Sequence, residues 1–175
     1  VLWRFADEEQ FSHFGTSAKY IETLMKNDVS PNTIFKLNNL KAICSTGSPL
    51  SAECYDYIYN NVGYVHLASI SGGTDIVSCF VLGVPNLPVR RGEIQGAGLG
   101  MAVEIWNDKG RVRRGERGEL VCTKPFPSRP VKFWNDIDDK KYHTAYFDRF
   151  DGVWAHGDFA EQTPDGGYII YGRSD

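Results

Sequence analysis

The chain has 175 residues, of which 42% are hydrophobic and 23% are charged, and its formal net charge is −3 at pH 7. This composition is typical of globular proteins and excludes a disordered or fibrous chain, and its slightly acidic balance offers no general attraction to nucleic acid or anionic membranes. The longest apolar stretch, Ile76–Val84, is interrupted by Ser78 and is far shorter than the roughly 20 residues that a membrane-spanning helix needs.

The first 80 residues alternate between expected helices and buried strands. Apolar residues at helical spacing predict an amphipathic helix over residues 14–27. Short apolar segments predict buried strands at Leu40–Cys44 and Tyr64–Ile70. A second helix is expected between them, with Pro49 near its first turn and an inner face formed by Leu50, Cys54, Tyr57 and Ile58. This order predicts an α/β sheet with helical crossovers, which binds ligands beyond the carboxyl ends of its strands.

After residue 80 glycine and proline become frequent and helical periodicity disappears. Strands are expected at residues 101–106, 111–114, 119–123, 158–162 and 168–171, joined in part by hairpin turns at Asn107–Gly110 and Thr163–Gly167. The chain is therefore expected to consist of an α/β part, residues 1–80, and a small β subdomain, residues 81–175.

The segment Ser71-Gly72-Gly73-Thr74-Asp75 is expected to form a glycine-rich loop directly after a strand. Glycines allow close approach of a ligand, a threonine hydroxyl can donate to a phosphate oxygen, and a carboxylate can hold Mg²⁺. The alternative is a tight turn in which Thr74 and Asp75 cap the next element.

Three further segments are candidates for ligand contacts. Asp158, which follows His156 and a glycine, could accept two hydrogen bonds from a ribose diol, or it could be an ordinary turn aspartate. Arg173 could clamp ribose or phosphate, or it could be a solvated loop charge. Gly47-Ser48-Pro49 forms a bend that could lie against a base edge and also precedes a helix. His156 is interpreted as structural because no serine or cysteine nucleophile pattern accompanies it.

Other patterns do not indicate a site. The glycines of Gly96–Gly100 do not follow the dinucleotide-binding spacing, and the aspartates near residue 138 lack the remaining features of a calcium loop. The arginines between residues 111 and 117 are expected to form a solvated face. The cysteines lack metal-ligand spacing and are expected to be reduced, which favours a cytosolic protein; they are Cys44, Cys54, Cys79 and Cys122.

Taken in order, these segments resemble the superfamily of adenylate-forming enzymes, which includes the acyl-CoA synthetases. Five segments carry the resemblance: Ser45–Leu50, Gly73–Asp75, Gly115–Leu120, His156–Asp158 and Gly172–Asp175. Within the superfamily the chain looks most similar to the synthetases that activate acetoacetate, through residues 14–20, 69–76 and 152–159. The resemblance covers essentially the whole chain and implies a fragment of the large N-terminal domain.

The resemblance implies a set of nucleotide contacts. Adenine would be bordered on one side by Gly47, Ser48 and Pro49, and on the other by Ser69, Ile70 and Ser71. Thr74 would bind the α-phosphate of ATP, Asp158 would accept both ribose hydroxyls, and Arg173 would contact ribose or phosphate.

The resemblance also implies a catalytic role for Thr74 and Asp75, with Asp75 as a ligand of Mg²⁺. Gly72 and Gly73 would border the acyl pocket, and Asp175 would be the hinge to a C-terminal domain. Acetate-activating relatives carry tryptophan at the position of Gly72, so glycine is expected to leave room for a four-carbon oxo-acid, and Gly72→Trp to shift preference toward acetate. The usual magnesium ligand of the family is glutamate, so the side chain of Asp75 is one methylene shorter than the usual ligand.

The implied reaction uses ATP, CoA and acetoacetate, and proceeds through an acyl-adenylate. The family's phosphate loop and its catalytic lysine are not within these 175 residues, so the chain alone is expected to catalyse poorly or not at all. The alternatives are activation of another short- or medium-chain acid, a truncated non-catalytic product that binds nucleotide or a partner, and a β-rich interaction module without nucleotide.

Overall fold

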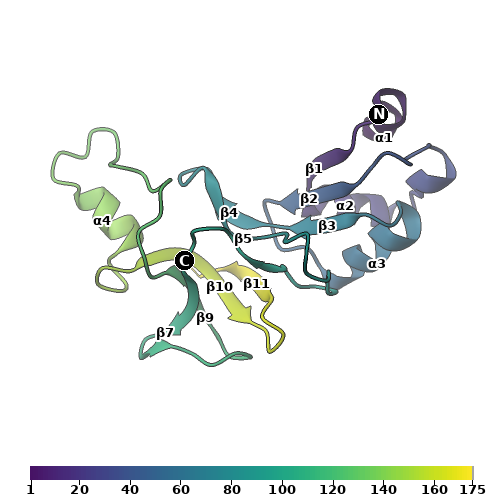
Figure 1. Ribbon diagram of the computed structural model, residues 1–175. Coiled ribbons are helices and arrows are strands. Elements are labelled where there is room, and N and C mark those ends of the chain that lie inside the picture. Colours follow the sequence, from purple (N-terminus) through teal and green to yellow (C-terminus); the bar gives the residue numbers. More distant parts are fainter. Residues whose placement is uncertain (175) are drawn as a thin grey trace. The chain divides into compact units, whose positions relative to one another are not determined.

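The computed structural model of the protein describes residues 1–174 (Figure 1). The chain forms two compact units. Unit 1 comprises Val1–Ser71 and Leu82–Gln95, and unit 2 comprises Gly72–Val81 and the chain from Gly96 onward. The segment Leu82–Gln95 therefore packs with unit 1, and the expected boundary after residue 80 stays a prediction.

Unit 1 contains a parallel sheet with strand order β1-β2-β3, formed by His13–Ser17, Ala42–Thr46 and His66–Ser69. Helix α2 (Ala18–Lys26) connects β1 to β2, and helix α3 (Ala52–Asn61) connects β2 to β3. A first helix, α1 (Leu2–Glu9), precedes the sheet, and a 3₁₀ turn, η1 (Pro31–Thr33), follows α2. The predicted α/β sheet with helical crossovers is confirmed.

The predicted helix over residues 14–27 is wrong in its first turn. Residues His13–Ser17 are a strand, with Phe14 opposite Ile43 in the parallel register. The helix begins at Ala18, where the Ser17 side chain caps it by accepting a hydrogen bond from the backbone N–H of Tyr20 at 3.2 Å. Phe14 matched the helical spacing, but it is buried as a strand residue because its backbone pairs with β2.

The second helix starts later than predicted. Its N-cap is Ser51, so Pro49 lies outside the helix. Cys54, Tyr57 and Ile58 form the buried inner face as predicted, whereas Leu50 is buried but precedes the helix.

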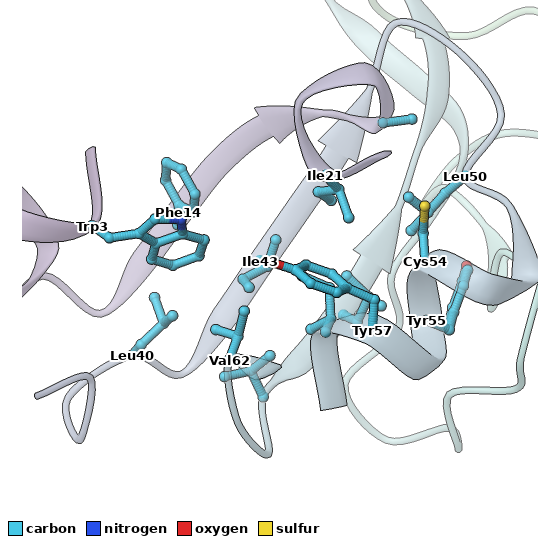
Figure 2. Packing of buried hydrophobic residues seen from close by; sticks show 14 of the residues in the cluster. Trp3, Phe14, Ile21, Leu40, Ile43, Leu50, Cys54, Tyr55, Tyr57 and Val62 are labelled. Atoms are coloured by element: carbon cyan, nitrogen blue, oxygen red, sulfur yellow. The ribbon is translucent and has the colours of Figure 1, made fainter. Parts of the chain in front are cut away.

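These elements enclose one hydrophobic core in unit 1 (Figure 2). At its centre Ile21, Ile43 and Ile58 are at most 1% exposed. Trp3 of α1 packs edge-on against Phe14 at a centroid distance of 5.0 Å. The core thus joins one face of α2 and α3 to the central strand β2.

Unit 2 contains a five-stranded sheet with strand order β11-β10-β9-β7-β8 and antiparallel pairing. The strands are β7 (Val103–Asn107), β8 (Gly110–Arg111), β9 (Arg117–Cys122), β10 (Trp154–Gln162) and β11 (Tyr168–Arg173). The predicted hairpins are present, although β8 is shorter and β10 begins earlier than predicted. Helix α4 (Lys140–Tyr146) was not predicted.

A second sheet, with strand order β4-β5-β6, corrects the expected loop at residues 71–75. Its strands are β4 (Ser71–Gly73), β5 (Ser78–Leu82) and β6 (Gly96–Ala97). The first three residues of the expected loop are therefore a strand, because β4 pairs with β5, and only Thr74 and Asp75 lie in the turn.

Two further expectations concern the described part of the chain. All four cysteines are free thiols, as predicted. Among residues 1–174, no helix has the length and apolar character to cross a membrane.

Candidate functional site

In unit 1 two predicted adenine-contacting segments leave the same edge of the sheet. Strands β2 and β3 are parallel neighbours, with Ser45 opposite Ser69, and the backbone N–H of Ile70 donates to the carbonyl oxygen of Ser45 at 2.9 Å. The carboxyl ends of parallel strands meet at one edge. The structure therefore brings Gly47–Pro49 and Ser69–Ser71 to this edge, where Gly47, Ser48 and Pro49 are exposed.

The strand residues behind this edge are buried, and the Ser45 hydroxyl is buried without a hydrogen-bond partner. Ser45 and Ser69 are 0% and 5% exposed. Tyr55 of α3 lies within hydrogen-bonding reach of Ser69 and donates its hydroxyl to the carbonyl oxygen of Glu93 at 2.8 Å. Burial raises the pKa of the Tyr55 phenol, so this hydroxyl stays a proton donor at neutral pH. At this edge of the sheet, buried strand residues are therefore followed by the exposed segment Gly47–Pro49.

In unit 2 the glycines of the predicted acyl pocket lie on β4 in close contact with neighbouring atoms. A Cβ atom on residue 72 would lie 2.6 Å from Cys79 Cα and closer still to the carbonyl oxygen of Ser78. A side chain at residue 73 would collide with the Asp75 carboxylate. Glycine at position 72 is therefore required for the close approach of β4 and β5. A tryptophan at this position would have to displace the backbone of β5, and the expected shift of Gly72→Trp toward acetate stays a prediction.

Thr74 and Asp75 are exposed in the turn that follows β4. The Tyr146 hydroxyl at the end of α4 donates to Asp75 Oδ2 at 2.7 Å. The Tyr146 ring stacks on Trp154 at a centroid distance of 3.6 Å and an interplanar angle of 14°. Burial first, and then the neighbouring Asp75 carboxylate, raise the pKa of Tyr146. One oxygen of Asp75 is therefore held by a neutral donor.

Asp158 and Arg173 face each other across the β10–β11 pair. Arg173 Nη1 donates to Asp158 Oδ1 at 3.3 Å and to the carbonyl oxygen of His156 at 3.1 Å. The Asp158 residue is only 8% exposed, whereas the Arg173 side chain is 55% exposed. The remaining lone pairs of the Asp158 carboxylate can accept further hydrogen bonds.

His156 is packed rather than poised for acid–base chemistry. Its ring lies edge-on against Phe80 at 4.6 Å, and its Nε2 is 3.2 Å from the carbonyl oxygen of Gly72. Its Nδ1 is buried without a hydrogen-bond partner. This environment favours the structural interpretation of His156.

Two residues around the predicted site were missed by the sequence. Tyr146 carries no local signal, since its role depends on a contact 71 residues away in the chain. Glu119 lies in the segment Gly115–Leu120, which carried part of the resemblance, but no role was assigned to it. Its carboxylate is 1% exposed, and a buried carboxylate between apolar strand residues is the signal that could have identified it.

Two other observations bear on the predicted site. Within residues 1–174, no group of three or more His, Cys, Asp or Glu side chains is arranged to hold a metal ion. The predicted hinge residue, Asp175, lies outside the described residues.

Comparison with known proteins gives consistent matches over the whole chain. It is 61% identical to an acetoacetyl-coenzyme A synthetase of Rhizobium meliloti (strain 1021) and 49% identical to an acetoacetyl-CoA synthetase of Gallus gallus, with 100% of this chain covered in both. The structure matches an acetoacetyl-CoA synthetase from Streptomyces lividans with a TM-score of 0.89 and 42% identity over 99% of this chain. The chain spans about a quarter of the length of these relatives (26–27%). No protein-family model matches the chain.

Proposed function

Because this chain corresponds from end to end to one segment of the acetoacetyl-CoA synthetases, we propose that it is part of an enzyme that converts acetoacetate to acetoacetyl-CoA. The observation that carries the proposal is the match over the full chain at 61% identity to a protein of that name. The enzyme would be an AMP-forming acid–thiol ligase that uses ATP and CoA.

The proposed reaction has two steps. A carboxylate oxygen of acetoacetate attacks the α-phosphorus of ATP, which forms acetoacetyl-adenylate and releases pyrophosphate. The CoA sulfur then attacks the acyl carbon and AMP leaves, with the thiol proton passing to solvent. The described residues contribute positioning and electrostatic stabilisation, and none of them is proposed to form a covalent intermediate.

The proposed nucleotide contacts concern each unit by itself. In unit 1 the segments Gly47–Pro49 and Ser69–Ser71 contact adenine, which is supported by their position at one exposed edge of the sheet. In unit 2 Asp158 accepts hydrogen bonds from the ribose hydroxyls and Arg173 contacts ribose or phosphate. Their mutual hydrogen bond supports this, because it orients the Asp158 carboxylate.

Thr74 and Asp75 act at the phosphates in this proposal. Thr74 donates to the α-phosphate from its exposed turn. Asp75 fits a magnesium ligand, since it is an accessible carboxylate oriented through Tyr146, and Mg²⁺ usually takes only one or two carboxylates together with phosphates and water. Bound Mg²⁺ would neutralise phosphate charge. Gly72 and Gly73 border the acyl pocket with backbone atoms only, because they have no side chains.

The location of the enzyme is part of the same proposal. We infer a cytosolic protein from the four free thiols, since disulfides are rare in that compartment. No nucleic acid is proposed as a partner, because the net charge of −3 provides no basic surface excess.

The experiment that tests the proposal measures AMP release by the full-length protein that carries this segment. The protein is supplied with Mg²⁺-ATP and CoA and with acetate, butyrate, acetoacetate or longer acids. A clear preference for acetoacetate is expected, and Asp158→Ala is expected to lower kcat/KM for ATP by roughly 100-fold, as loss of two hydrogen bonds to a charged group does. The exposed Asp165→Ala serves as the control.

The other outcomes separate the alternatives. Preference for a different acid would keep adenylation and discard acetoacetate as the substrate. No AMP release with any acid, together with binding of AMP, would favour a non-catalytic nucleotide-binding protein. No binding of nucleotide at millimolar concentration would favour an interaction module.

A further inference from the structure

The strand β10 departs from regular pairing at the residues that carry Asp158. Ala155 pairs with Val121 of β9 and Phe159 pairs with Glu119. Four steps along β10 therefore match two steps along β9, so that His156, Gly157 and Asp158 stand opposite Leu120 alone. Bulges of this kind reorient side chains and interrupt the backbone ladder. The position of the Asp158 carboxylate depends on whatever holds this bulge.

One side of the bulge is held by the buried carboxylate of Glu119. Its Oε1 accepts the backbone N–H of Gly157 at 2.6 Å. Its Oε2 accepts Nη1 of Arg149 at 2.6 Å, and the Glu119 side chain is 1% exposed. The Glu119 carboxylate thus accepts the backbone N–H of Gly157, the residue before Asp158, in place of a backbone carbonyl of β9. Since a buried polar group without a partner is costly, the hydrogen bond from Arg149 helps to hold the Glu119 carboxylate in place.

The other side of the bulge is held by β11. Arg173 donates to the carbonyl oxygen of His156, and the backbone N–H of Ser174 donates to the carbonyl oxygen of Gly157 at 2.8 Å. Gly157 has a φ of +83°, and a Cβ atom there would lie 2.9 Å from Arg173 Cζ. The bulge is therefore held by two side chains, Glu119 from β9 at the backbone N–H of Gly157 and Arg173 from β11 against Gly157.

We infer that Glu119 and Arg149 are positioning residues for nucleotide binding: together they fix the bulge at residues 156–158 so that the Asp158 carboxylate meets the ribose diol. This inference rests on the proposed function, in which Asp158 binds the ribose hydroxyls. Neither residue touches the nucleotide in this scheme. Their effect is transmitted through the backbone N–H of Gly157 to the next residue.

The test compares two nucleotides that differ only in the diol. Affinities of the full-length protein for AMP and for 2′,3′-dideoxy-AMP are measured by calorimetry. The wild type is expected to prefer AMP by at least roughly tenfold, because hydrogen bonds to a carboxylate are lost with the diol. Asp158→Asn gives the ratio of the AMP affinity to the 2′,3′-dideoxy-AMP affinity that is expected when the carboxylate itself is removed.

Glu119→Gln is expected to bring the ratio of the two affinities to within about threefold of 1, while the affinity for 2′,3′-dideoxy-AMP stays within about twofold of the wild type. A role confined to stability would lower Tm and leave the ratio of the folded protein unchanged. Arg149→Met provides a second variant that removes a half-exposed side chain and is expected to lower the ratio in the same direction. The control is Glu116→Gln, an exposed glutamate of the same segment, which is expected to keep the wild-type ratio.

The outcomes distinguish this inference from the proposed function. If the wild type prefers AMP and Arg149→Met and Glu119→Gln retain that preference, the inference is overturned and the proposed function stands. If Glu119→Gln does not fold, the ratio of Arg149→Met decides in the same way. If the wild type binds both nucleotides equally or neither, the proposed diol contact fails and the inference fails with it.

Discussion

At the scale of single residues, the surroundings of Asp75 show how a predicted ligand depends on a residue far away in the chain. Asp75 is exposed, and an exposed carboxylate samples several rotamers unless something holds it. Tyr146 donates a hydrogen bond to it at 2.7 Å, and the ring that carries this hydroxyl is fixed by stacking on Trp154. The hydroxyl can therefore be removed without removing the ring.

Tyr146→Phe is expected to raise the Mg²⁺ concentration that half-saturates AMP formation by roughly tenfold, because residues that orient a metal ligand typically contribute this much. The stacking on Trp154 is kept, so Tm is expected to change little. Both quantities are measured on the full-length protein.

Tyr142→Phe is the matched control, since the Tyr142 hydroxyl is buried without a hydrogen-bond partner and its ring also lies near Trp154. It is expected to leave the Mg²⁺ dependence unchanged. An equal Mg²⁺ dependence in Tyr146→Phe and the wild type would contradict the assignment of Asp75 as a metal ligand oriented by Tyr146.

A second residue-scale prediction concerns alkaline pH. Burial raises the pKa of Tyr57 to about 12, and its hydroxyl donates to the carbonyl oxygen of Val29 at 2.6 Å. Between about pH 10 and 12 the unfolded chain releases this proton while the folded chain keeps it, so the unfolded state binds fewer protons. The free energy of unfolding is therefore expected to fall with rising pH in this window, by up to about 1.4 kcal/mol per pH unit from this residue.

The measurement is the denaturant midpoint of the wild type, Tyr57→Phe and Tyr64→Phe from about pH 8 to 11. Tyr57→Phe is expected to reduce the alkaline decline. Tyr64, whose residue is 99% exposed, is expected to leave the decline as it is in the wild type. An unchanged slope in Tyr57→Phe would show that another group causes the decline.

At the scale of elements, the hairpin β4–β5 explains a glycine that the sequence assigned to substrate selection. Gly72 permits the backbone of β4 to approach β5, and a Cβ atom there would lie 2.6 Å from Cys79 Cα. Gly72→Ala is expected to lower the free energy of unfolding by roughly 1–3 kcal/mol, as overpacking does, measured by urea denaturation.

Gly15→Ala in β1 is the control for Gly72→Ala, since a Cβ built on Gly15 has no atom within 4 Å apart from those of its own residue and its two chain neighbours. It is expected to be close to neutral. Wild-type stability in Gly72→Ala, combined with an altered acid preference, would restore the view that this position acts mainly on the acyl pocket.

Helix α2 offers a second element-scale prediction. The Ser17 hydroxyl accepts the backbone N–H of Tyr20, so Ser17→Ala is expected to cost about 1 kcal/mol of unfolding free energy. Ser51→Ala at the start of α3 is the comparison, because Ser51 makes no capping hydrogen bond there and should cost less. Equal costs in the two variants would mean that the cap does not determine where α2 begins.

At the scale of the whole molecule, the chain represents 26–27% of the length of its relatives. The resemblance implies a phosphate loop and a catalytic lysine outside these 175 residues. The isolated 175-residue polypeptide is therefore expected to release no AMP under conditions in which the full-length protein does. AMP release by the isolated chain that is abolished by Asp158→Ala would contradict this expectation.

The sequence alone predicted much of the fold because the relevant signals are local. The inner face of α3, with Cys54 and Ile58 one turn apart, follows from helical periodicity. The hairpin of β10 and β11 follows from a Thr-Pro-Asp-Gly-Gly turn between two expected strands. The matched segments likewise pointed to the synthetases that act on acetoacetate, which the comparisons support.

The tertiary structure decided what depends on contacts distant in sequence. The strand at Phe14 forms because β2 pairs with it, which local spacing does not reveal. The contact of Glu119 with Gly157 joins residues 38 apart, and that of Tyr146 with Asp75 joins residues 71 apart. Residue type and spacing predict which groups can bind a ligand, but burial and long-range pairing determine how those groups are held, because both arise only when distant segments pack together.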